Sequence, residues 1–145
     1  NLNKINTGKK IDASARKFLN RDGLDYAHGT GHGVGFFLNV HEGPQSISKY
    51  NSVKIKEGMI LSNEPGYYKK GYYGIRIENL VYVKKNKKNL QFENLTLAPI
   101  EAKLINYKLL SKSEKDYLFK YHLTIYSMYY KFLNVKERKW LASLI

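Results

Sequence analysis

The stretch His28-Gly-Thr-Gly-His32-Gly-Val-Gly-Phe-Phe-Leu-Asn-Val-His41-Glu-Gly-Pro44 decides how the rest of this 145-residue chain is interpreted. It holds three of the four histidines of the sequence. A helix is disfavoured here, because each glycine would cost a helix about 1 kcal/mol relative to alanine. The glycines instead suit a backbone that approaches another group closely. Residues 34–40 are largely apolar without a helical period, which predicts a buried strand.

Two glutamates further along the chain are placed where they could face these histidines. Glu64 follows the apolar run Met59-Ile60-Leu61, which predicts a short buried strand ending in a Pro-Gly turn. Glu78 lies in residues 72–83, whose alternation with a period of two predicts the clearest strand. Taken alone, Glu78 fits an exposed strand face better, or a weak cross-strand ion pair involving Arg76.

The histidines and glutamates together indicate a metal site. A single histidine in an apolar region is usually a hydrogen-bonded structural residue, but three within one glycine-rich stretch favour a functional role. Imidazole and carboxylate groups suit Mn²⁺, Co²⁺, Fe²⁺ or Zn²⁺ rather than an ion selected by thiolates. The residues alone therefore predict a metal-assisted hydrolase.

Elsewhere the sequence predicts one early helix, then strands up to about residue 100, and helices after it. We expect a helix over residues 11–20, with Asp12 favourable in its first turn and Gly23 as a left-handed cap. We expect a loop at 45–56, turns at 69–71 and 86–89, and a strand at 90–97. Further helices are expected from Ser113 onward and over 135–145. The helical spacing in the first of these predicts an apolar face made of Tyr117, Leu118, Tyr121, Ile125, Met128 and Phe132.

His122, the fourth histidine, lies among these regularly spaced residues. Because its neighbours have core spacing, we predict that it packs in a core or a dimer interface rather than taking part in catalysis.

The composition is that of a globular protein. With 43% apolar residues the chain can bury a core, and it contains no cysteine for disulfides or thiolate metal sites. No apolar run approaches the ~20 residues needed to span a bilayer, and no signal-peptide pattern opens the sequence. We therefore expect a cytoplasmic protein without membrane partners. Because the sequence does not begin with Met, we also expect a fragment or a processed product.

The net charge of +13, from 25 Lys and Arg against 12 Asp and Glu, raises the alternative of a nucleic-acid-binding protein. The lysines are scattered or sit at turns, as in the Lys84-Lys85 and Lys87-Lys88 pairs, rather than along one helix face. This distribution is typical of a solvated surface, so we expect no nucleic-acid partner.

Four blocks of the sequence together resemble a known family. They are His28-Gly-Thr-Gly-His32-Gly-Val-Gly, Asn39-Val-His41-Glu-Gly-Pro44, Asn63-Glu64-Pro-Gly-Tyr-Tyr68 and Gly74-Ile-Arg76-Ile-Glu78-Asn79. In order and spacing they are similar to the C-terminal half of aminopeptidase P, the Xaa-Pro aminopeptidase. The segments 11–16 and 24–27 fit the same family, and the tail from Leu109 through Trp140 resembles its C-terminal extension.

The resemblance implies an α+β fold of the pita-bread (creatinase/aminopeptidase-like) type, of which this chain would be the C-terminal half. It implies a curved, mostly antiparallel mixed sheet with flanking helices and a helical C-terminal tail. Residues 1–100 would be the second half of the catalytic domain, and residues 101–145 the C-terminal extension.

The resemblance also implies a reaction and its residues. The enzyme would hydrolyse the N-terminal bond of peptides with proline in second position, with two divalent ions, Mn²⁺ by preference and Co²⁺ or Zn²⁺ as alternatives. His32 and Glu64 would bind one metal, and Glu78 would bridge both. Glu64 would also move protons, His28 and His41 would contact the peptide and the tetrahedral intermediate, and Arg76 would orient a carboxylate ligand. The family is often dimeric, so a homodimer is expected.

The family uses five ligands, and two of them are aspartates in the earlier half of the fold. Asp12, Asp22 and Asp25 do not match that motif, so we expect this chain alone to be catalytically incomplete. Two alternatives stay open: a prolidase-like dipeptidase of the same fold, and a non-enzymatic binding module of that fold. The paired blocks around His41 and Glu64, with the helical tail, favour aminopeptidase P.

Overall fold

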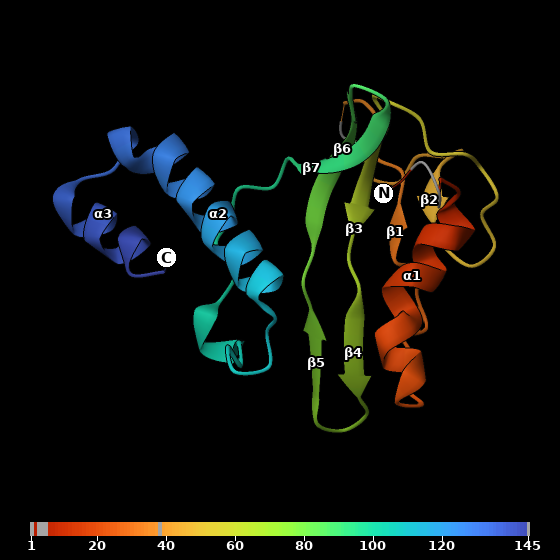
Figure 1. Cartoon of the computed structure of the whole chain (residues 1–145), viewed down its shortest axis with the longest axis horizontal. Coiled ribbons are helices and arrows are strands. Elements are labelled where there is room, and N and C mark those ends of the chain that lie inside the picture. Colours follow the sequence, from red (N-terminus) through yellow and green to blue (C-terminus); the bar gives the residue numbers. More distant parts are fainter. Residues whose placement is uncertain (1, 3–5, 38, 145) are drawn as a thin grey trace. The chain divides into compact units, whose positions relative to one another are not determined.

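A computed structural model describes residues 2, 6–37 and 39–144 of the chain (Figure 1). Contacts between residues divide the chain into two compact units, Asn1–Thr96 and Leu97–Ile145. The first unit contains one helix and seven short strands, and the second contains only helices, counting described residues. None of the described helices is both long and apolar enough to cross a membrane.

Helix α1 (Gly8–Arg21) confirms the helix predicted over residues 11–20. It begins at Thr7, whose hydroxyl accepts from the Lys10 N–H. Just beyond its end, Gly23 adopts the predicted left-handed conformation with φ of 71°. The prediction for Asp12 was wrong. Because the helix starts at Gly8, Asp12 lies beyond the first turn and is buried rather than placed at the helix end.

A long antiparallel hairpin runs through the first unit in two pieces (Figure 1). Strand β3 (Ile60–Asn63) pairs with β6 (Asn79–Asn86), and β4 (Gly66–Lys69) pairs with β5 (Tyr73–Arg76). The turn predicted at residues 69–71 therefore closes a hairpin, and Gly71 has a φ of 78°. The single strand predicted over residues 72–83 was wrong in one respect, because it is broken between β5 and β6.

Three further strands complete the first unit. Strand β7 (Asn89–Asn94) pairs with β6 across the predicted turn, where Lys87 has a φ of 54°, so the three-stranded sheet has the order β3-β6-β7. Strands β1 (Gly31–His32) and β2 (Ser46–Ile47) form a separate antiparallel pair. The segment after β1 runs along β3, with Gly33 bridging Leu61.

The buried strand predicted over residues 34–40 was wrong. Val34 donates its N–H to Ile60, but the chain then turns back on itself, with Gly35 N–H donating to the Asn39 carbonyl. Phe36 is 90% exposed and Phe37 is 82% exposed. The backbone pairs with β3 only as far as Val34, so the side chains of Phe36 and Phe37 are not covered. Leu38, also part of the predicted strand, lies outside the described residues.

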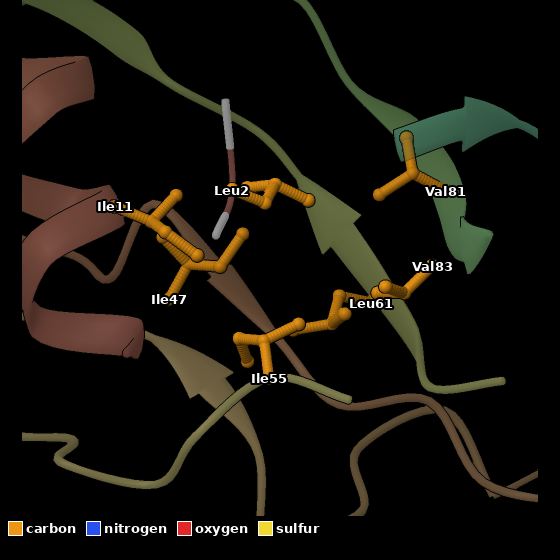
Figure 2. Close-up of a cluster of buried hydrophobic side chains, with 7 residues drawn as sticks. All are labelled: Leu2, Ile11, Ile47, Ile55, Leu61, Val81 and Val83. Atoms are coloured by element: carbon orange, nitrogen blue, oxygen red, sulfur yellow. The ribbon is translucent and has the colours of Figure 1, made fainter. Parts of the chain in front are cut away.

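The core of the first unit forms between α1, β2, β3 and β6 (Figure 2). Its buried side chains are Leu2, Ile11, Ile47, Ile55, Leu61, Val81 and Val83. Each fully buried aliphatic side chain of this kind stabilises the fold by about 1.5–3 kcal/mol. Two core members, Ile47 and Ile55, come from the segment predicted as a plain loop, which is therefore anchored at both ends.

The second unit contains α2 (Lys112–Tyr129) and α3 (Val135–Ala142), with short 3₁₀ turns at Ala102–Leu104 and Tyr130–Phe132. Ser111 and Asn134 start the two α-helices through capping boxes with Glu114 and Glu137. Both predicted helices are therefore confirmed. The core of this unit consists of Tyr121, Ile125 and Leu141, with partly buried neighbours.

The apolar face predicted for α2 was only partly right. Tyr121 and Ile125 are buried, whereas Tyr117, Met128 and Phe132 are exposed. His122 is buried as predicted for a structural residue, and its Nε2 accepts the Ile100 N–H at 3.1 Å. Burial lowers the pKa of His122 below its usual value, which keeps the ring neutral and able to accept this bond.

Candidate metal centre

The break in the long hairpin places two glutamates opposite each other. Asn63 pairs with Asn79 and Gly66 pairs with Arg76, so both pieces share one register. Continued through the break, that register puts Glu64 opposite Glu78, with their side chains on one face. The Glu64 N–H donates instead to Thr30 O at 2.8 Å, so the strand is held by the segment that carries the histidines.

His32, Glu64 and Glu78 converge at this break. Each offers one possible ligand atom, and these atoms all lie within 4.8 Å of one another. His32 Nε2 lies 3.4 Å from Glu64 Oε1. His32 and Glu64 are partly buried and Glu78 is exposed. Three segments distant in sequence thus bring one imidazole and two carboxylates to a single point.

The hydrogen bond at Nδ1 of His32 leaves the other ring nitrogen, Nε2, able to bind a cation. His32 Nδ1 donates to Gly33 O at 2.9 Å, so Nε2 of the neutral ring keeps its lone pair. Ser62 Oγ donates to Glu64 Oε1 at 2.8 Å and accepts the His32 N–H at 2.9 Å. Such supporting contacts are typical of metal ligands, and the donor set fits a divalent ion of the manganese-to-zinc group.

Two glycines allow these segments to come together. A Cβ on Gly31 would overlap the carbonyl oxygen of Ser62, and a Cβ on Gly33 would overlap that of Glu42. The prediction that the glycines serve close backbone approach is therefore confirmed at both positions.

His41 reaches the centre from the exposed loop. Its ring meets the His32 ring edge-on, with centroids 4.1 Å apart and planes at 82°. Glu42, the next residue, donates its N–H to Gly33 O at 2.9 Å and accepts from Asn39 Nδ2 at 2.5 Å. These bonds close the loop and bring His41 back beside His32.

His28 belongs to a hydrogen-bond chain with Tyr68 and Arg76. Nδ1 of His28 lies 2.7 Å from Gly29 O, which can only accept, so Nε2 of the neutral ring accepts from Tyr68 Oη at 2.8 Å. Tyr68 Oη in turn accepts from Arg76 Nε at 2.9 Å. The bond to Tyr68, with the nearby charges of Glu64 and Glu78, raises the pKa of Arg76 above its usual value.

Sequence reasoning assigned no role to Ser62, Tyr68 or Arg16. Ser62 and Tyr68 lie two residues before Glu64 and two residues after Gly66 along one hairpin arm. Because residues two apart in a strand share a face, this spacing is a signal that could have found them. Arg16 is buried, and its signal is the pair of aspartates Asp12 and Asp25 that flank it in sequence.

Residues 2–85 match the model of metallopeptidase family M24, and residues 88–144 match the C-terminal region of that peptidase family. A probable Xaa-Pro aminopeptidase P of Coprinopsis cinerea is 49% identical over 148 residues, covering 93% of this chain and 24% of the relative. Xaa-Pro aminopeptidase 1 of Dictyostelium discoideum is 47% identical, covering 99% and 25%.

Solved structures of similar peptidases also match this chain. The X-prolyl aminopeptidase of Caenorhabditis elegans, described as a cytosolic enzyme with a di-nuclear active site, matches with a TM-score of 0.85 at 38% identity, over 94% of this chain and 24% of that one. The prolidase of Pyrococcus furiosus matches with a TM-score of 0.53 at 37% identity, over 61% and 25%. The chain thus spans about a quarter of the length of its relatives.

These matches confirm both the resemblance stated from the four sequence blocks and the predicted α+β pita-bread fold. The family model alone covers more than half of the residues. The chain belongs to metallopeptidase family M24.

Proposed function

We propose that the protein containing this chain is a metal-dependent aminopeptidase that removes the N-terminal residue of peptides with proline in second position. The convergence of His32, Glu64 and Glu78 within 4.8 Å carries this proposal. The names of the relatives, Xaa-Pro aminopeptidases of fungal and Dictyostelium origin, support the substrate class.

His32 and Glu64 would hold one divalent ion, and Glu78 would bridge it to a second. Mn²⁺ is the preferred ion, with Co²⁺ or Zn²⁺ as alternatives, and the di-nuclear site described for the C. elegans enzyme supports the number. Two such ions, when bound, lower the pKa of a shared water and polarise the scissile carbonyl. Two further aspartates would come from the earlier half of the fold, so the three groups present here form an incomplete ligand set.

The other residues would handle the peptide and the protons. Glu64 would take up and release the proton of the attacking water, since Ser62 already orients its Oε1. His41, exposed beside His32, would contact the peptide. His28 would contact the tetrahedral intermediate only when its bond to Tyr68 opens, because both ring nitrogens have partners. Arg76 would act through Tyr68 and the charges of the nearby carboxylates.

We further propose that residues 1–100 belong to the catalytic domain and residues 101–145 to its C-terminal extension. A homodimer is proposed because exposed aromatic side chains of the extension, such as Trp140, suit an interface. The cytosolic description of the C. elegans enzyme supports a cytoplasmic location.

A prolidase-like dipeptidase is the second candidate, supported by the matches to prolidases. The relatives that match over 93% and 99% of the chain are named Xaa-Pro aminopeptidases, and this favours the first candidate. A binding module without activity is disfavoured, because His32, Glu64 and Glu78 are all retained.

The test uses the full-length protein with Mn²⁺ and three peptides, Ala-Pro-Ala, Ala-Pro and Ala-Ala-Ala. Preferred cleavage of the tripeptide with proline supports the aminopeptidase, and preference for the dipeptide supports the prolidase. His32→Ala and Glu78→Gln should each lower kcat/KM by more than the ~10–100-fold typical of outer contacts to a metal. Glu93→Gln, which alters a glutamate paired with Lys84 away from the centre, is the control. Unchanged hydrolysis in the first two variants contradicts the proposed ligands.

A further inference from the structure

We propose that Arg16 is a positioning residue that holds His28 and Glu64 in their places from the far side of the site. The inference rests on the proposed function for the roles of those two groups. The geometry is independent of the proposed function, because hydrogen bonds link helix α1 to the candidate metal centre.

The guanidinium of Arg16 donates four hydrogen bonds. Nε donates to Asp12 Oδ2 at 2.8 Å, and Nη1 donates to Asp25 Oδ1 at 2.6 Å and to Tyr26 O at 2.7 Å. Nη2 donates to His28 O at 2.5 Å. One side chain therefore fixes the backbone on both sides of residue 27, at the start of the glycine-rich stretch that carries the site.

Burial and charge make the Arg16 side chain depend on these hydrogen-bond partners. The side chain of Arg16 is 7% exposed and that of Asp12 is 2% exposed. A buried cation is costly unless it is paired and fully hydrogen-bonded, and here two aspartates pair with it. The planar fork of arginine meets several acceptors at fixed angles, which the single ammonium group of lysine cannot do.

A first route leads from Arg16 to the imidazole of His28. Besides the bond to His28 O, the guanidinium lies 3.9 Å from the centroid of the Tyr26 ring. The Tyr26 ring contacts the His28 ring, with centroids 4.9 Å apart. Arg16 thus restrains both the backbone and one ring face of His28.

A second route leads to Glu64. Asp12, oriented by Arg16, accepts from Thr30 Oγ1 at 2.6 Å, and Thr30 is buried. Thr30 O then accepts the Glu64 N–H at 2.8 Å. Loss of the guanidinium fork would therefore loosen the attachment of Glu64 as well as that of His28.

The test compares Arg16→Lys with Arg21→Lys in the full-length protein. Arg21 lies on the same helix but is 74% exposed, so its change should leave activity unaltered. Arg16→Lys should lower kcat for Ala-Pro-Ala by about 10-fold or more while KM changes little, as for other residues that orient ligands. In a His28→Ala background the same change should cost much less, because part of its effect acts through His28. Full additivity would overturn the first route.

Hydrogen exchange provides a readout independent of activity. In Arg16→Lys the Glu64 amide should exchange at least several-fold faster, while the Val83 amide, bonded to Met59 O in the same unit, keeps its rate. Equal rates at Glu64 in folded variant and wild type would overturn the proposal. If Arg16→Lys does not fold, Asp25→Ala replaces it, because Asp25 binds Arg16 at a half-exposed position. Asp25→Ala must then show the same faster hydrogen exchange at the Glu64 amide. Wild-type protein without activity on Ala-Pro-Ala would contradict the proposed function, but the exchange result would still decide the role of Arg16.

Discussion

Residues 30–33 and residues 34–37 are neighbours in one glycine-rich stretch, yet they are packed in opposite ways. The first segment lies against β3, bonded to Glu64 and bridged to Leu61, and its Thr30 is buried. The second segment leaves β3 and exposes Phe36 and Phe37. The segment with two glycines and His32 is the more buried one, and the segment with Phe36 and Phe37 is exposed. Backbone pairing, rather than apolar content, decides which half is covered.

The largest expected effect tests which side chains stabilise the fold. Leu61→Ala should lower the free energy of unfolding by about 2–5 kcal/mol, because Leu61 is fully buried in the core beside residue 33. Phe36→Ala should change it by less than about 0.5 kcal/mol, since the larger side chain is exposed. Urea denaturation measures both, and equal losses would remove the contrast between the two segments.

A second, smaller effect concerns the close approach of backbones. Gly31→Ala should destabilise the protein by about 1–3 kcal/mol, because the new Cβ would overlap Ser62 O. Gly29→Ala is the matched control, since its Cβ would lie 3.4 Å from the nearest atom, Ile47 O. Thermal unfolding of both variants checks this, and a harmless Gly31→Ala would show that the segment can move away from β3.

The smallest expected effect lies in the exposed segment. Phe37 has a φ of 51°, a left-handed conformation that costs most residues about 1 kcal/mol. Phe37→Asn should therefore stabilise the protein slightly, because asparagine tolerates this conformation. Phe36→Asn, one residue earlier, should give no such gain. A loss of stability at residue 37 would mean that the aromatic ring contributes contacts that outweigh its backbone strain.

The sequence singled out His32, Glu64 and Glu78, whose possible ligand atoms the structure brings within 4.8 Å of one another, although the role of Glu78 came only from the family resemblance. Glycine spacing around His32 excluded a helix, and the turn after Glu64 located the end of a strand. The four blocks in order also identified the family. Helix α1 and its cap at Gly23 were predictable because spacing and a left-handed glycine are read within a few residues.

Features that depend on distant partners could not be predicted. The alternation through Glu78 continues without interruption, and the break appears only because the opposite strand carries Glu64-Pro65 and bonds to Thr30. Nothing local distinguishes Phe36 from a buried strand residue. Asp12 has the spacing of a helix-start carboxylate. Its burial involves Arg16, one turn further along the same helix, and Thr30, which reaches it from a distant part of the sequence.

The most direct test of the central claim is Mn²⁺ binding to the full-length protein, measured by calorimetry with Glu78→Gln and Glu93→Gln. The two substitutions are chemically identical, and they differ only in that Glu78 lies with His32 and Glu64 whereas Glu93 pairs with Lys84. We predict a loss of affinity or stoichiometry for Glu78→Gln and unchanged binding for Glu93→Gln. Equal Mn²⁺ binding by both variants and the wild type would contradict a metal centre at the break of the hairpin.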